Sequence, residues 1–343
     1  MCRLLGQKNF AKNLLTKNPQ IGLSERMMQF KRRFLSGIVL FVLFGSSLVV
    51  LVNAEPSWVM WSKTFGGTDY DQAYSLVKTS DGGYALAGNT YSFGAGDSDF
   101  WLIKTDGSGN VEWNETYGGA GYDSASSLVQ TSDGGYALAG QTESFGAGLG
   151  DFWLVKTDEY GNMEWSRTYG GVGRDSANSL VQTSDGGYAI AGNTFSFGAG
   201  EDDVWLVKTD GSGNMEWNRT YGGAGYDLAS SLVQTSDGGY GLAGGTRSLG
   251  FGNSDVWLVK TDGLGNMEWN RTYGGEVNDC ANSLVETSDG GFALAGGTES
   301  FGAGGYDVWF IRTNEQGIPE FPSWNILPLL FVAALTVIIC KSG

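Results

Sequence analysis

The chain has 343 residues, a net charge of −16 and no histidine. The lack of histidine excludes Ser-His-Asp and Cys-His catalytic arrangements and every His-ligated metal site. The acidic balance argues against a nucleic-acid partner, because nucleic acid carries its own negative phosphates. Glycine contributes 56 residues and aromatic side chains 13%, which indicates an ordered fold with glycine-based turns.

The first 54 residues have the pattern of an export segment. Lys31, Arg32 and Arg33 precede an apolar run over 34–52, and Ala54 stands at its exit. A basic, an apolar and a small-residue region in this order predict a secretory signal peptide. An uncleaved membrane helix is the alternative, because a run of 19 residues nearly spans a bilayer.

Residues 55–318 consist of five repeats. The segment Thr-Ser-Asp-Gly-Gly recurs every 52 residues without insertion or deletion, and two tryptophans per unit keep the same step. Self-similarity at this period is the signature of a propeller or a solenoid. We expect the tryptophans to form the core between units, because each indole can bury a large apolar area. The copies of the segment begin at Thr79, Thr131, Thr183, Thr235 and Thr287.

Each unit predicts four strands. In the second unit we expect strands over 125–131, 136–142, 151–157 and 163–169. The Asp133-Gly134 pair between the first two supplies the positive φ that a tight hairpin needs. No window shows a helical period. Four strands in a unit of this length predict a propeller blade, so the fold class is an all-β, five-bladed β-propeller.

The phase of the repeat predicts how the ring closes. The chain enters the repeats on a strand of the type that ends each unit, and it leaves without another such strand. We therefore expect 58–65 to pair with the strands around 283–287, 292–298 and 307–313. Closure of this kind removes exposed sheet edges. Five contiguous blades without this latch are the alternative.

The segment from Asp106 to Trp113 resembles the tryptophan-docking segment of quinoprotein-type propellers, and the whole unit is similar to repeats of secreted prokaryotic propellers. The resemblance covers all five units and implies the fold. The chain differs from the quinoprotein enzymes in spacing, in blade number and in lacking a cofactor-site insertion, so the resemblance implies no cofactor.

The C-terminal residues 319–343 contain a second apolar run, over 326–340, which we expect to form a membrane segment. The preceding Pro319-Glu320-Phe321-Pro322 resembles the PEF-type sorting signals of archaeal surface proteins. The resemblance implies anchoring at the outer face of the cell membrane. A plain membrane tail is the alternative, and both leave the repeats outside the cell.

Two sets of repeated aspartates are candidate ligands. The first set follows the Gly-Gly pair of each unit and could ring the axis, which would suit a hard cation such as calcium. The alternative is that each carboxylate fixes its own loop. This set is Asp71, Asp123, Asp175, Asp227 and Asp279.

The second set begins the third strand of each unit, beside a Gly-rich loop. A lectin-like interpretation places a sugar site in each blade, with these carboxylates as acceptors and Tyr70, Tyr122 and Tyr226 stacking on the sugar. Arg174 and Asn278 replace the tyrosine in the other two units, so the sites would be unequal. The carboxylates are Asp99, Asp151, Asp203, Asp255 and Asp307.

Three further patterns concern the surface. The turn from Asp106 to Asn110 weakly resembles a calcium loop, but an ordinary turn explains it. One position varies while its neighbours repeat, as expected of a solvated or partner-selecting residue. Its occupants are Tyr91, Glu143, Phe195, Arg247 and Glu299. Asn114, Asn218 and Asn270 open Asn-x-Thr sequons, which predict glycan acceptors on an exported protein.

These patterns favour a binding or adhesion module for a glycan or a protein, held at the cell surface. A structural envelope repeat without a specific ligand is the second hypothesis. A glycoside hydrolase or quinone-dependent oxidoreductase is the third, but every candidate acid is copied in each unit, whereas a catalytic pair is normally one asymmetric site. The sequence contains no Walker, Gly-x-Ser-x-Gly or metalloprotease motif.

Overall fold

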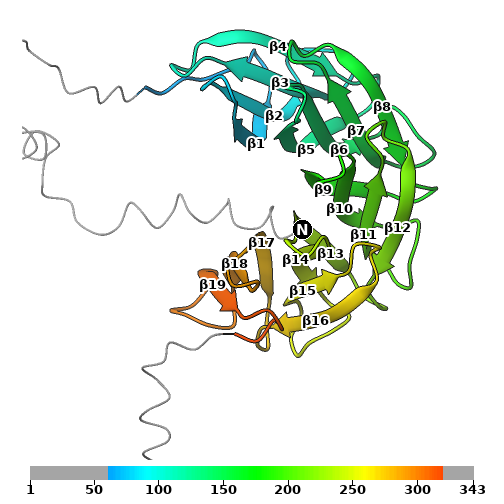
Figure 1. The fold of residues 1–343 in the computed structure, drawn as a ribbon, viewed down its shortest axis with the longest axis vertical. Coiled ribbons are helices and arrows are strands. Elements are labelled where there is room, and N and C mark those ends of the chain that lie inside the picture. Colours follow the sequence, from blue (N-terminus) through cyan, green and yellow to red (C-terminus); the bar gives the residue numbers. More distant parts are fainter. Residues whose placement is uncertain (1–60, 320–343) are drawn as a thin grey trace, which may run out of the picture. The chain divides into compact units, whose positions relative to one another are not determined.

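The computed structural model describes residues 61–319, and these contain 19 strands and no helix. The strands form five antiparallel sheets, four of four strands and a last one of three, each with its strands in chain order. The described strands belong to a compact unit that begins at Ser62. Figure 1 shows the sheets following one another from β1–β4 to β17–β19. The described part of the chain is therefore all-β, built from 52-residue repeats with the antiparallel sheets of a β-propeller.

The strand bounds repeat from sheet to sheet. The first sheet contains β1 (Asp71–Lys78), β2 (Tyr84–Thr90), β3 (Asp99–Thr105) and β4 (Val111–Tyr117). The second contains β5 (Asp123–Gln130), β6 (Tyr136–Thr142), β7 (Asp151–Thr157) and β8 (Met163–Tyr169). The third contains β9 (Asp175–Gln182), β10 (Tyr188–Thr194), β11 (Asp203–Thr209) and β12 (Met215–Tyr221).

The fourth sheet contains β13 (Asp227–Gln234), β14 (Tyr240–Thr246), β15 (Asp255–Thr261) and β16 (Met267–Tyr273). The last contains β17 (Asp279–Glu286), β18 (Phe292–Thr298) and β19 (Asp307–Thr313). Contacts between sheets join each sheet to the next one along the chain, chiefly through the first two strands of each.

The hairpin turns form as the sequence predicts. Gly134 has a φ of 91° and donates its N–H to the carbonyl of Thr131 at 2.9 Å. The next N–H, of Gly135, donates to Asp133 Oδ1 at 3.0 Å. Asp-Gly therefore closes the turn twice, once through the backbone and once through the carboxylate.

The core lies between consecutive sheets. The third strands β3, β7, β11 and β15 are buried along their whole length, whereas the fourth strands are largely exposed. Phe100 of the first sheet packs on Trp153 of the second, with ring centroids 4.6 Å apart. Phe152 packs in the same way on Trp205 of the third sheet at 4.7 Å. The indoles thus join neighbouring sheets, as expected.

A buried lysine connects three parts of each of the first four sheets. Lys156 Nζ lies 2.9 Å from Asp133 Oδ2, 2.8 Å from Glu164 Oε2 and donates to the Thr157 carbonyl at 2.8 Å. Burial raises the pKa of Asp133, but hydrogen bonds from Lys156 and Thr131 outweigh it and lower the pKa to about 2. The equivalent Asp185 and Asp237 also have a pKa of about 2.

We therefore expect stability to fall in acid. A depressed carboxyl pKa stabilises the fold above about pH 4, and this contribution disappears as the pH falls towards 2. Lys156→Met should lower the unfolding midpoint in urea at pH 7 and change it much less near pH 2. An equal loss at both pH values would contradict this assignment.

The two outer faces of the series of sheets are exposed. Leu76 in β1 is 62% exposed, whereas its counterparts Leu128, Leu180, Leu232 and Leu284 are 3% exposed. At the other end Val308 and Phe310 in β19 are 90% and 66% exposed, whereas Phe100 and Leu102 are fully buried. Each end therefore presents the apolar face that an adjoining sheet covers elsewhere in the repeat.

The expected latch is not formed in the described part of the chain. Residues 61–65 make no strand, and β19 pairs only with β18 apart from an isolated bridge between Thr313 and Pro319. This bridge places Pro319 where Val111 pairs with Thr105 in the first sheet. Pro319 therefore pairs with Thr313 at a place where we expected the N-terminal strand 58–65 to pair. Residues 58–60 of that strand lie outside the described residues.

The expected signal peptide within 1–54 and the apolar segment at 326–340 also lie outside the described residues. Within 61–319 the structure contains no helix that is long and apolar enough to cross a membrane.

Candidate functional site

The first set of aspartates holds the loops between sheets. Asp123 Oδ2 accepts the Gly119 N–H at 2.9 Å and the Ser144 hydroxyl at 2.6 Å. Asp71, Asp175, Asp227 and Asp279 bind the equivalent glycine and serine. Within 61–319 no group of three or more metal-ligating side chains comes together. A cation at these carboxylates would have to displace the hydrogen bonds that fix the loops, so the geometry favours the loop-fixing alternative.

The second set lies beneath the Gly-rich loops. Asp151 is 1% exposed, and its Oδ2 accepts the Ala147 N–H at 2.5 Å. Burial raises its pKa, against the effect of this hydrogen bond. Asp99, Asp203 and Asp255 are equally buried, and only Asp307 in the last sheet is partly exposed among the five. In the first four sheets these carboxylates hold their loops and do not reach the surface where we expected them to contact a sugar.

Two variable positions of the repeat, those of Tyr70 and Tyr91, lie side by side. The N–H of Tyr91 donates to the Tyr70 carbonyl at 3.0 Å, and Glu143 donates to Tyr122 at 2.9 Å. Ser98 then bridges Tyr122 of the next sheet, and the Asp123 N–H donates to the Ser98 carbonyl at 2.7 Å. Backbone hydrogen bonds therefore join the two positions within a sheet, and a second bond, beside Tyr122, joins one sheet to the next.

We call these ten positions the variable row. Their side chains are exposed or half-buried, and they include aromatic, acidic, basic and amide groups. Some residues between them, such as Asp71 and Thr90, are identical in all five repeats. The row consists of Tyr70, Tyr91, Tyr122, Glu143, Arg174, Phe195, Tyr226, Arg247, Asn278 and Glu299.

The row begins with three tyrosines. The Tyr91 ring lies 6.2 Å from Tyr70 and 6.4 Å from Tyr122, with the first pair edge to face. Tyr70 is 61% and Tyr91 is 42% exposed. Gln72 accepts the Tyr70 hydroxyl at 2.8 Å, so an amide borders the cluster. This end of the row offers exposed aromatic rings and neutral polar groups.

The remainder of the row carries charge. Arg174 donates to Gln141 Oε1 at 2.9 Å and 3.1 Å, and Gln141 donates to Glu143 at 3.3 Å. The guanidinium of Arg247 lies 5.4 Å above the Tyr226 ring, which therefore has a cation on its face. The predicted stacking residues Tyr70, Tyr122 and Tyr226 thus share the row but have different surroundings.

Sequence reasoning missed the residues that support the row from below. Asn193 donates to Asp202 Oδ2 at 2.8 Å, and Asn89 donates to Ser98 Oγ at 3.1 Å. Both positions vary between repeats as position 91 does, with Gln141 and Gly150 as their occupants in the second unit. The variation of these positions between repeats is the sequence signal that could have identified them.

Asp202 has an unusual environment within this support. The pKa of Asp202 is raised to about 6, chiefly by burial. The hydrogen bond from Asn193 and the charge of Arg174 lower this pKa, whereas the charge of Asp175 raises it. A raised carboxyl pKa disfavours folding when the group is ionised, so the cost is present above about pH 6 and vanishes below about pH 4. Ser98 and Ser254 occupy the equivalent position in two other repeats.

We therefore expect Asp202→Ser to raise the melting temperature at pH 7 by a few degrees, with the gain shrinking towards pH 4. Differential scanning calorimetry at the two pH values measures this. The neighbouring exposed Glu201→Ser is the control and should give no comparable gain. A gain for Asp202→Ser that did not depend on pH would contradict the assignment.

The other predicted positions have structural partners. Asp106 Oδ1 accepts the N–H groups of Ser108 and Asn110, both at 2.8 Å, so the turn that resembles a calcium loop is closed by its own carboxylate. Asn114, Asn218 and Asn270 accept the indole N–H of Trp101, Trp205 and Trp257. Their glycosylation remains a prediction.

Fold and site together define a repeat protein of the β-propeller type that carries a variable row on a constant framework. No family model matches the chain. A stretch of 177 residues is 26% identical to the regulatory protein FlaEY of Caulobacter vibrioides and covers 43% of this chain. The chain spans 19% of the length of that relative.

The solved structures that the chain resembles have low sequence identity and TM-scores below 0.5. The chain is similar to a putative gluconolactonase, with 13% identity and a TM-score of 0.41 over 71% of this chain and 74% of that one. It is also similar to Sqt1 from Chaetomium thermophilum, with 11% identity and a TM-score of 0.39 over 73% and 71%.

Proposed function

We propose that the chain is an exported, surface-anchored binding module that recognises a glycan or a protein through the variable row. The observation that carries the proposal is the contrast within the repeat. Positions 70 and 91 of the first unit and their equivalents take different chemical classes, while the aspartates and threonines between them do not change. A constant framework with changing side chains suits selective recognition.

The tyrosine end of the row provides the test. Wild type and the triple variant Tyr70→Ala, Tyr91→Ala, Tyr122→Ala should be compared on glycan and protein arrays. We expect wild type to bind selectively and the variant to lose this binding. Tyr160→Ala is the matched control, because Tyr160 is 64% exposed in a turn at the opposite end of its sheet.

Two results would count against the proposal. Binding that survives the triple variant would place recognition elsewhere. The absence of any ligand for a folded wild-type protein would favour the structural envelope repeat instead. Export and C-terminal anchoring are part of the proposal, supported by the basic and apolar pattern before Ala54 and by the Pro319–Pro322 motif.

We further propose that the five sheets close into one ring. The exposed face of β17–β19 is equivalent to the face with which each earlier sheet packs on the sheet that follows it. The exposed face of β1–β4 is equivalent to the face with which each later sheet packs on the sheet that precedes it. A cavity of about 60 Å³ on the first sheet, lined by residues that include Gly88 and Trp101, is equivalent to the place where Phe100 meets Gly140 and Trp153. Val308 would fill it.

The segment 61–65 fits this arrangement. Lys63 Nζ donates to Asn110 Oδ1 at 2.5 Å, at the turn of the first sheet. Its counterpart Glu115 lies in β4 and packs at the equivalent turn of the second sheet, beside Gly161. Lys63 therefore lies against the first sheet at the position that Glu115, a residue of a fourth strand, takes against the second sheet. Closure would let the segment complete the last sheet beside Val308 and Phe310.

A further inference from the structure

One hydrogen bond repeats in three of the four complete sheets. The indole N–H of Trp101 donates to Asn114 Oδ1 at 3.0 Å. Trp205 and Trp257 donate to Asn218 and Asn270 at 3.2 Å. In the last two cases the asparagine amide also points to the sulfur of a methionine, with Asn218 Nδ2 3.2 Å from Met215 Sδ. A carboxamide group thus fills the space between indole and thioether.

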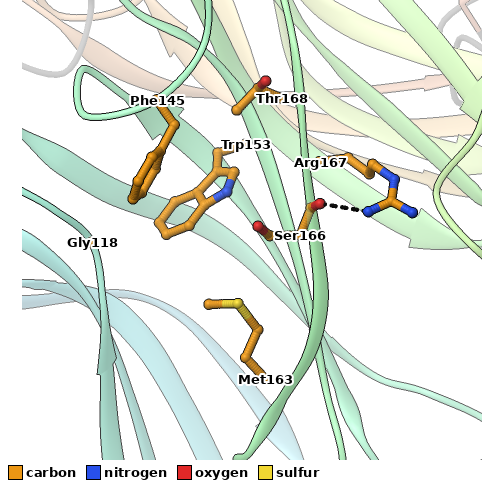
Figure 2. Close-up of a pocket in the computed structure, with 7 residues that line it drawn as sticks. All are labelled: Gly118, Phe145, Trp153, Met163, Ser166, Arg167 and Thr168. Atoms are coloured by element: carbon orange, nitrogen blue, oxygen red, sulfur yellow. Dashed lines mark hydrogen bonds between the residues drawn. The ribbon is translucent and has the colours of Figure 1, made fainter.

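The second sheet lacks this carboxamide. Ser166 stands at the equivalent position, and the structure gives Trp153 Nε1 no hydrogen-bond partner among the described residues. A cavity of about 300 Å³ opens there, lined by residues that include Phe145, Trp153, Met163 and Ser166. Figure 2 shows the indole nitrogen of Trp153 on the side of the ring that faces Ser166, with Phe145 beside the ring and Met163 below it.

The chemistry of the missing group indicates what would replace it. The neighbouring sheets place a carbonyl oxygen opposite the indole N–H and an amide nitrogen near the methionine sulfur. An acetamido group has the same carbonyl and N–H, and its methyl could contact Phe145, whose ring lies 5.2 Å from that of Trp153. The rim supplies the hydroxyls of Ser166 and Thr168, which suit the hydroxyl groups of a sugar.

We propose that this cavity binds the acetamido group of an N-acetylated sugar, with Trp153 Nε1 donating to its carbonyl oxygen. This site is separate from the variable row and stands whether or not the row binds a ligand. It belongs to the second repeat because only there does serine replace the asparagine among the four complete units in residues 61–319. The repeat therefore contains its own control for the site.

The test is saturation-transfer NMR and calorimetric titration with N-acetylglucosamine, with glucose as the probe that lacks the acetamido group. We expect N-acetylglucosamine to bind once per chain and glucose to bind at least about tenfold more weakly, because glucose leaves the indole donor unpaired. Ser166→Asn should abolish binding without lowering the melting temperature, since it restores the side chain that the other sheets carry.

The reciprocal variant Asn218→Ser should open a second site at Trp205, so that two molecules of N-acetylglucosamine bind per chain. Its melting temperature reports whether the third sheet remains folded. N-acetylglucosamine binding that persists in Ser166→Asn, equal binding of glucose, or no binding to the folded wild-type protein would each overturn the proposal.

Discussion

Trp205→Ala should lower the free energy of unfolding by about 3–5 kcal/mol, the usual cost of truncating a large core side chain. Trp205 is 1% exposed, and its ring lies 4.7 Å from Phe152 of the preceding sheet and 5.1 Å from Phe197 of its own repeat. Its removal would empty the contact between two sheets and leave Asn218 Oδ1 without its indole donor. Urea unfolding followed by circular dichroism measures the loss.

Trp217 is the matched control within the same repeat. It is half-buried in β12 and contacts Tyr240 of the next sheet at 5.8 Å. Trp217→Ala should therefore cost less, about 1–2 kcal/mol, because less apolar surface is lost. Equal losses for the two variants, or a negligible loss for Trp205→Ala, would refute the packing described for the first of them.

Val308→Asp should destabilise the protein by about 3 kcal/mol or more if the first and last sheets cover one another, because closure would bury the new charge. The counterparts of Val308 at this position are at most 2% exposed wherever a sheet follows. Leu76→Asp, on the opposite face, should have a similar effect. Thermal unfolding of each variant measures the cost.

Val172→Asp is the control for these substitutions, because Val172 is 85% exposed in a loop between sheets. It should change stability little. If Val308→Asp and Leu76→Asp were as mild as Val172→Asp, the two faces would be solvent-exposed in solution and the ring would be open.

The strands could be predicted closely from the sequence because turns and alternation repeat. In the second repeat three of the four strands, β6, β7 and β8, have the expected bounds, whereas β5 is Asp123–Gln130 and not 125–131. The early start follows from pairing of Asp123 with Thr142 and of Ser124 with Gln141, ahead of a bulge between Ala125 and Ser127. A bulge adds a residue that the alternation of side chains does not reveal.

The site was harder to predict because it depends on contacts between loops. Repetition identified Tyr70, Tyr122 and the variable position of Tyr91, but not that Tyr91 pairs with Tyr70. The role expected of Asp151 depended on its exposure, and the folding of the Gly-rich loop over it decided that. Likewise, the effect of Ser166 is visible only once Asn218 is seen to contact Trp205.

A cross-link between the first and last sheets tests the ring most directly. Between neighbouring sheets the N–H of Leu284 donates to Ser231 Oγ at 3.1 Å, and Ser283 and Leu76 hold the equivalent positions at the two ends. In a background in which Cys2, Cys280 and Cys340 are replaced by serine, Leu76→Cys with Ser283→Cys should react with a short thiol cross-linker to give a monomeric product. The positive control Ser231→Cys with Leu284→Cys should do the same. A product of twice the mass, or no product while the control reacts, would contradict closure within one chain.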